Sequence, residues 1–234
     1  MLFYSTKIEN GFAWLDEEES RHLLAVLRRK LGDRLQITDG QGFMYETELS
    51  EIGKKYAVAR ILARTPVPLQ SAGRLHIAIA PTKQIERFEW FLEKATEIGV
   101  DEITPLLCRR SERETVRHDR LEKILVSAMK QSLRGFLPKL SPLTPFPALV
   151  KKAAEPQKRI AWCADEPVPH LKTRLAPDSD ALVLIGPEGD FAPEEVKLAL
   201  ENGFEAVGLG PARLRTETAG VLVAAIAGMR DGER

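Results

Sequence analysis

The chain has 234 residues, 44% of them hydrophobic and 29% charged, and its 34 basic and 34 acidic side chains cancel to a formal net charge of zero. This composition supports a packed core in one large or two small domains, and no apolar run approaches the roughly 18 residues of a membrane span. The two cysteines, Cys108 and Cys163, are distant in sequence and have no histidine at metal-ligand spacing. We therefore expect a cytoplasmic, reduced protein that binds no metal and no membrane.

The first part of the chain is expected to be mostly β-structure. Asp16 can cap one helix, which is expected to run to about Lys30. Alternating apolar and polar residues from Phe43 to Leu49 predict a half-buried strand, and residues 56–62 predict another. Short strands at this spacing indicate a small barrel. Residues 65–73 have linker composition, so we place a boundary there, with domains at 1–68 and 74–234.

The second part alternates strands with helices. Strands are expected at 75–80, 103–108, 160–164, 181–185 and 206–209, and helices at about 85–98, 121–133, 193–201 and from Thr216 onward. A connection rich in proline, at residues 138, 142, 145 and 147, is expected to separate the second helix from the third strand. This alternation predicts an α/β domain whose mainly parallel sheet carries helices on both faces.

Two glycine-rich loops follow strands of the second domain. The first begins Gly186-Pro187-Glu188-Gly189-Asp190, and the second runs from Gly208 to Thr218. Ligands of open α/β sheets bind beyond the carboxyl ends of the strands, where such loops lie. Neither loop has the dinucleotide or P-loop motif. Backbone groups and apolar walls suit an adenosine-containing ligand, while two tight strand-to-helix turns are the structural alternative.

The order of these motifs resembles that of a known family. Residues 182–189 (LVLIGPEG), Leu209-Gly210 and residues 214–219 (LRTETA) resemble the paired signatures of the SPOUT methyltransferases. Within them, the chain is similar to the family that methylates N3 of a uridine in bacterial 16S ribosomal RNA. Further matches include residues 93–100 (EKATEIGV) and Gln131-Ser132, so the resemblance covers nearly the whole chain.

This resemblance implies a PUA-like RNA-binding β-barrel followed by a SPOUT α/β domain with a C-terminal trefoil knot. It also implies a homodimer that binds S-adenosylmethionine in the knot and acts on 16S rRNA or the small ribosomal subunit. The residues that correspond to cofactor contacts are Leu184, Gly186, Pro187, Glu188, Gly189, Leu209, Gly210, Leu214, Thr216, Thr218 and Ala219. The family usually has glycine where this chain has Asp190. Ala192 stands where a Ser or Thr helix cap would be expected before Pro193.

The chemistry of methyl transfer to uracil N3 suggests catalytic candidates. Negative charge spreads to the carbonyl oxygens of the base, where a cation stabilises it. Arg215 is the first candidate for this cation, although a surface arginine beside a helix start is the alternative. Glu217 is a candidate base, although a carboxylate at this position also stabilises the start of a helix.

Basic side chains are concentrated in two parts of the chain, around residues 28–34 and from 109 to 134. The second part contains eight Lys and Arg but only four Asp and Glu. The expected RNA contacts are Arg28, Arg29, Arg109, Arg110, Lys130 and Arg134. Solvated helix faces are the simpler interpretation of either cluster alone. Two other functions stay open at this point: a related methyltransferase that acts on a ribose hydroxyl or a guanine, and a non-catalytic RNA-binding assembly factor.

Overall fold

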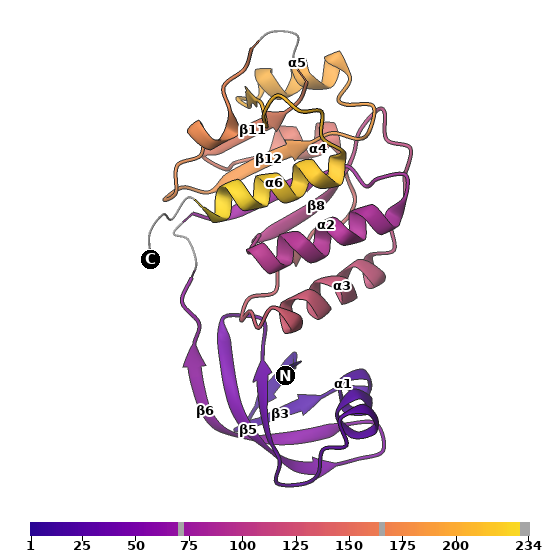
Figure 1. Cartoon of the computed structure of the whole chain (residues 1–234), viewed down its shortest axis with the longest axis vertical. Helices are drawn as coiled ribbons and strands as arrows, with labels where there is room; N and C mark the ends of the chain where they lie inside the picture. Colours follow the sequence, from indigo (N-terminus) through magenta and orange to yellow (C-terminus); the bar gives the residue numbers. More distant parts are fainter. Residues whose placement is uncertain (70–72, 164–166, 230–234) are drawn as a thin grey trace. The chain divides into compact units, whose positions relative to one another are not determined.

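A computed structural model describes residues 1–69, 73–163 and 167–229. The chain forms two compact units. Unit 1 contains residues 1–69 together with residues 126–137, and unit 2 contains residues 70–125 and 138–234. Each unit has a sheet and a core of its own (Figure 1). The predicted boundary segment 65–73 includes residues 70–72, which lie outside the described residues.

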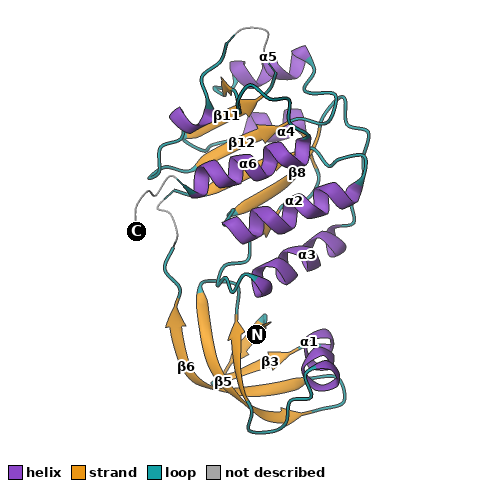
Figure 2. Cartoon of the chain, in the orientation of Figure 1, coloured by secondary structure: helices purple, strands orange, loops and turns teal. Residues whose placement is uncertain are grey.

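Unit 1 contains a six-stranded sheet in the order β1-β4-β5-β6-β3-β2, in which only β1 and β4 pair in parallel. Register shifts after Glu46 and after Leu49 mark irregular pairing between the long strands β5 and β6, which curve around the core (Figure 2). The small predicted barrel is thus a curled sheet. Its strands are β1 (Leu2–Tyr4), β2 (Lys7–Glu9), β3 (Phe12–Leu15), β4 (Arg34–Thr38), β5 (Phe43–Ile52) and β6 (Ala57–Pro66).

The helix of unit 1 is shorter than the sequence predicts. Asp16 caps α1 (Glu17–Arg21) by accepting the Glu19 amide at 2.8 Å, and one π-helical segment, η1 (His22–Val26), follows. The helical structure then ends because Arg28 adopts a left-handed backbone with φ 54°. The prediction that this helix reaches Lys30 is therefore wrong. Leu23 anchors the segment in the core beside Phe3, Leu15, Leu35 and Ile37.

Unit 2 is built on a parallel sheet in the order β10-β8-β7-β12-β11-β13, with β9 also paired to β8. Its main strands have apolar, β-branched sequences because helices cover both of their faces. The central strand β12 is buried throughout. The strands are β7 (Leu75–Ile79), β8 (Glu102–Leu107), β9 (Lys139–Leu140), β10 (Thr144–Pro145), β11 (Gln157–Ala161), β12 (Ala181–Ile185) and β13 (Glu205–Val207).

Alternate residues of each strand face different helices. Ala78 and Leu184 belong to the core that packs against α4 (Phe146–Lys152) and α5 (Pro193–Glu201). On the other face, α2 (Ile85–Ile98) and α6 (Thr216–Gly228) lie side by side (Figure 1). Gly220 of α6 allows this close approach, since a Cβ there would lie 2.5 Å from the Phe91 ring and 2.9 Å from Ile79. The predicted α/β fold is confirmed.

Two predictions for unit 2 need correction. The proline-rich connection contains a helix, α4, because Pro147 occupies its first turn, where a missing amide hydrogen breaks no helical bond. The expected strand at 160–164 begins earlier, at Gln157, and ends at Ala161, while residue 164 lies outside the described part of the chain. Helix α3 (His118–Gln131) begins in unit 2 and ends in unit 1. In the described residues no helix is long and apolar enough to cross a membrane.

Candidate functional site

The two glycine-rich loops of unit 2 meet at a side-chain hydrogen bond. The first loop, residues 186–192, connects β12 to α5, and the second loop, residues 208–218, follows β13 and includes the first residues of α6. The strands themselves are not neighbours, because β11 lies between them. The Thr216 hydroxyl nevertheless donates to the Gly186 carbonyl oxygen at 3.1 Å, in a buried position. The two loops are therefore in direct contact at the carboxyl edge of the sheet.

The first loop is held by groups from two other strand ends. After β7, the Lys83 amide donates to the Glu188 carboxylate at 2.9 Å. After β8, the Arg110 guanidinium donates to the carbonyl oxygens of Gly189 at 2.8 Å and Phe191 at 3.3 Å. The Arg110 bonds satisfy two loop carbonyls, and the Lys83 bond holds the Glu188 side chain, so the loop is supported before any ligand binds.

Asp190, which stands where the resemblance leads us to expect glycine, is accommodated by its own hydrogen bonds. Its φ of 60° lies in the left-handed region, which aspartate tolerates better than most residues. One carboxylate oxygen accepts the Phe191 amide at 2.8 Å, and the other accepts the Cys163 amide at 3.0 Å. The aspartate thereby links the first loop to the chain after β11.

Helix α5 is capped although Ala192 has no polar side chain. The Glu195 carboxylate accepts the Ala192 amide at 2.9 Å and the Arg109 amide at 2.8 Å. Half of a capping box is thus present, supplied from the third helical position. The loss of helix stability expected from Ala192 is partly offset by Glu195.

The second loop offers exposed backbone between apolar side chains. Gly210 has a φ of 118°, and a Cβ at this position would meet nothing within 4 Å. Leu209 and Leu214 are half-buried on either side of it. The loop starts from a fixed point, because the Gly208 amide donates to the Pro169 carbonyl at 3.0 Å. Open space at a glycine, apolar neighbours and free backbone fit a ligand of the adenosine type.

The predicted cofactor residues differ in what they can offer a ligand. Leu184 is fully buried in the core, so its side chain has a packing role, and Pro187 and Ala219 are also buried. Glu188, Gly189 and Gly210 are exposed at the loop surfaces, and Thr218 is exposed on α6. Direct contact with a ligand is therefore open mainly to loop backbone and to the half-buried leucines.

The two catalytic candidates are placed very differently. Arg215 is exposed at the N-cap of α6 and makes no side-chain capping bond. Glu217 is only 7% exposed, and its Oε1 lies 3.9 Å from Nε of Arg87 on α2. No sequence pattern singles out Arg87, because its importance depends on the packing of α2 against α6.

The predicted RNA-binding cations do not all have free charges. Arg28 is exposed, and Arg29 is exposed and lies 3.8 Å from Asp33. Arg109 pairs with Glu194 at 3.1 Å, and Arg110 holds the first loop as described above. Lys130 pairs with Glu19, which is 6% exposed, within unit 1. Arg134 is half-buried in the same unit.

Within residues 1–69, 73–163 and 167–229, no group of His, Cys, Asp and Glu side chains is arranged to hold a metal ion. Burial, together with the nearby Glu195 carboxylate, raises the pKa of the Cys108 thiol far above its ordinary value. This thiol therefore stays protonated at neutral pH and is a poor nucleophile.

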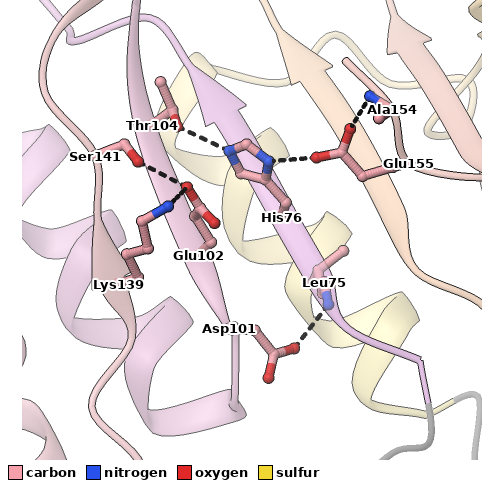
Figure 3. A network of polar contacts seen from close by, with 9 residues as sticks. All are labelled: Leu75, His76, Asp101, Glu102, Thr104, Lys139, Ser141, Ala154 and Glu155. Carbon is pink, nitrogen blue, oxygen red and sulfur yellow. Dashed lines mark hydrogen bonds and ion pairs between the residues drawn. The ribbon is translucent and has the colours of Figure 1, made fainter. Parts of the chain in front are cut away.

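A second polar cluster lies at the opposite, amino-terminal edge of the sheet (Figure 3). His76 of β7 is hydrogen-bonded to Glu155 at 3.0 Å and to Thr104 of β8 at 2.8 Å. The nearby Glu102 accepts hydrogen bonds from Lys139 at 2.8 Å and Ser141 at 2.7 Å. These groups satisfy one another and join four chain segments, so we assign the cluster a structural role.

Unit 1 is built on a curled β-sheet. Unit 2 is a parallel α/β domain whose candidate site lies in two glycine-rich loops. Residues 69–228 match the family model of an RNA methyltransferase domain, and residues 15–62 match that of an RNA methyltransferase PUA domain. The chain therefore belongs to this family of RNA methyltransferases.

Individual relatives are similar to this chain over nearly its full length. A solved protein from Porphyromonas gingivalis, described as a probable rRNA-methyltransferase, is 38% identical, covers 98% of this chain and 97% of its own, and superposes with a TM-score of 0.91. Ribosomal RNA small subunit methyltransferase E from Neisseria gonorrhoeae, solved with bound S-adenosyl methionine, is 29% identical over 98% of this chain and 96% of its own, with a TM-score of 0.85. The enzyme of the same name from Mycobacterium bovis is 29% identical over 98% of this chain and 91% of its own.

Proposed function

We propose that this protein is an S-adenosylmethionine-dependent rRNA methyltransferase of the small ribosomal subunit, acting on N3 of a uridine in 16S rRNA. Family membership and the relatives named above support the rRNA methylation activity and the methyl donor. The choice of uridine N3 rests on the sequence signatures of residues 182–189 and 214–219. The single observation that carries the proposal is the Thr216–Gly186 hydrogen bond, which brings the two predicted cofactor-binding loops into contact.

The donor, when bound, supplies an activated methyl group on a sulfonium. The residues of this chain must therefore hold the donor and the base in line and keep water out. The exposed Gly189 and Gly210 would present backbone to the methyl donor, with Leu209 and Leu214 as apolar walls. The buried Gly186 would hold the first loop through its hydrogen bond with Thr216. Uracil N3 lies on the pairing edge of the base, so the target nucleotide must be unpaired and turned out of its stack.

A direct test of the donor site is calorimetric titration with S-adenosylmethionine. We expect the wild-type chain to bind S-adenosylmethionine. The variant Thr216→Val should bind it more weakly, because valine keeps the shape of the side chain but lacks the hydroxyl that donates a hydrogen bond to Gly186. The loss is expected to be about 1 kcal/mol, or roughly fivefold in affinity. Wild-type binding without any effect of Thr216→Val would mean that the joined loops are not the site.

The modified atom is tested by incubating the purified protein with unmethylated small subunits and mapping the RNA by mass spectrometry. A methyl group on N3 of uridine is the expected product. A methyl group on a ribose or on a guanine would assign the chain to another reaction of the superfamily. Binding of RNA with no transfer would favour the alternative of an assembly factor.

The trefoil knot and the homodimer are part of the same proposal. Strand β13 lies at the edge of the sheet, yet the next helix, α6, packs against α2 and β7 near its middle, so the chain must return across the sheet. Such a return supports a knot. Leu222 and Ala225 of α6 are only half-buried in the single chain, which supports further burial against a second copy. Light scattering measures the oligomeric state, for which we expect a dimer. We also propose that the protein acts in the cytoplasm.

A further inference from the structure

Glu217 and Arg87 form an incomplete ion pair beside the two loops. The Glu217 residue is 7% exposed, and its Oε2 is buried without any hydrogen-bond partner. Its Oε1 lies 3.9 Å from Nε of Arg87, which is too long for a hydrogen bond. A buried carboxylate with one unsatisfied oxygen is unfavourable for folding. An unsatisfied buried group of this kind calls for an explanation, and a catalytic role is one of them.

The guanidinium of Arg87 has unused hydrogen-bonding capacity. Its side chain is 37% exposed, and it makes no side-chain hydrogen bond in the described part of the chain. Two other arginines of unit 2 are hydrogen-bonded by comparison: Arg113 donates to the carbonyls of Thr82 and Lys83, and Arg120 donates to Glu89. Arg87 is therefore a cation anchored on one side by Glu217 and open on the other.

The position of this pair connects it to both loops. Arg87 is in the first turn of α2, shortly after Lys83, whose amide binds Glu188 of the first loop. Glu217 follows Thr216, the residue that joins the second loop to the first. Each member of the pair thus follows, within four residues along its own segment, a residue that is hydrogen-bonded to the first loop.

We propose that Arg87 contacts the target uracil and stabilises its carbonyl oxygen during methylation, and that Glu217 is the positioning residue that holds Arg87 in place. This inference rests on the proposed function. As N3 forms its bond to the methyl carbon, the donor's carbon–sulfur bond breaks and its electron pair stays on sulfur. The N3 proton passes to a base from solvent. Negative charge is shared by O2 and O4 of the uracil until the new bond is complete, and a preorganised guanidinium stabilises it there.

Arg215, the candidate from sequence, is less suited to this role. It is exposed at the N-cap of α6, and its side chain makes no capping bond. An unanchored side chain must be ordered when the substrate binds, which lowers its contribution. Arg87 has its anchor before the substrate arrives.

The test compares variants of the full-length protein with small-subunit RNA as substrate. Arg87→Gln is expected to lower kcat by about a hundredfold or more, as removal of one oxyanion donor does in other enzymes. Its affinity for S-adenosylmethionine and for RNA, measured by calorimetry, should stay at the wild-type value. Arg87→Lys should recover only part of kcat, because lysine keeps the charge but lacks the planar fork. Glu217→Gln, which keeps the shape of the side chain, should lower kcat without changing KM.

The pH profile separates a catalytic from a structural role. Stabilising the carbonyl oxygens eases loss of the N3 proton, so the rise of kcat with pH should move to higher pH in Arg87→Gln. Arg120→Gln is the matched control, since it also removes an arginine paired with a glutamate of α2. This control should keep the wild-type pH profile and lose little of kcat.

Three results would overturn the inference. One is a kcat in Arg87→Gln equal to that of Arg120→Gln. Another is a larger kcat loss in Arg215→Gln than in Arg87→Gln, which would return the role to Arg215. The third is a raised KM with a reduced salt dependence and an unchanged kcat, which would make Arg87 a phosphate contact. All three results concern variants of an active enzyme. If the proposed function were wrong, the wild-type protein itself would place no methyl group on uridine N3.

Discussion

Asp190 illustrates how a single residue can satisfy a backbone conformation that usually selects glycine. Its left-handed φ is stabilised by bonds to the amides of Phe191 and Cys163. Replacement by glycine would relieve the conformation but lose both bonds. The residue that departs from the family pattern therefore has a definite structural role, and this role can be measured.

We expect Asp190→Gly to lower the free energy of unfolding by about 1 to 2 kcal/mol through the two missing hydrogen bonds. Asp190→Ala should lose about 1 kcal/mol more, because alanine has no side-chain partner and is strained at this φ. Urea denaturation of both variants gives the comparison. An alanine variant as stable as wild type would show that the carboxylate contributes nothing to the loop.

At the level of elements, the contact between α2 and α6 fixes the relative positions of residues proposed for the candidate site. Gly220 lets the two helices approach, since any side chain there would meet Phe91 and Ile79. Helix α6 carries Thr216 and Glu217, and α2 carries Arg87. A change in helix spacing would therefore move groups of the site as well as reduce stability.

Gly220→Ala is expected to destabilise the protein by about 1 to 3 kcal/mol, the usual penalty for overpacking. Gly228→Ala on the same helix is the control, because its nearest neighbour is the side chain of Ile98 at 3.2 Å. Chemical denaturation should rank the two variants in that order, and Phe91→Leu should recover part of the loss at Gly220. Equal stability of the two alanine variants would contradict the proposed close packing.

The cluster at the amino-terminal edge of the sheet makes stability depend on pH. The hydrogen bond from His76 lowers the pKa of Glu155 below its ordinary value of 4.5, although burial opposes the shift. For Glu102, burial alone would raise the pKa, but the bonds from Lys139 and Ser141 lower it overall. A lowered folded-state pKa contributes stability that is present above pH 4.5 and is lost as the pH falls through the folded-state value.

Glu155→Gln should therefore be less stable than wild type at neutral pH, and the difference should shrink as the pH falls below 4.5. Thermal unfolding measured across this range tests the sign. His76→Asn removes the other partner, so the double variant should lose less than the sum of the single losses. A difference between Glu155→Gln and wild type that is constant with pH would exclude this carboxylate as the titrating group.

At the scale of the whole molecule, RNA binding requires cations that are not already used within the fold. Arg28 is exposed, whereas Arg110 donates to carbonyls of the first loop. Lys130 pairs with the buried Glu19, so its removal would leave an unpaired carboxylate in unit 1. The residues predicted to contact RNA therefore also have different roles within the fold.

We expect Arg28→Gln and Arg110→Gln to weaken RNA binding and to reduce its salt dependence, by a slope of about one for each phosphate that the variant no longer neutralises. Arg110→Gln should in addition weaken S-adenosylmethionine binding, because the first loop loses its support. Binding isotherms over a salt series, with and without the donor, separate the two effects. Unchanged salt slopes in both variants would remove Arg28 and Arg110 from the RNA-binding surface.

The sequence by itself determined the alternation of strands and helices in unit 2, the glycine-rich loops and the family, because these depend on local periodicity and on motifs of consecutive residues. It did not determine the end of the helix near Arg28 or the presence of α4, where a single backbone conformation and the position of Pro147 decide the outcome. Only the tertiary structure brought Thr216 to Gly186 and Glu217 to Arg87, since each pair is separated by at least 30 residues along the chain. Contacts of this kind arise from the packing of whole elements, which no local pattern encodes.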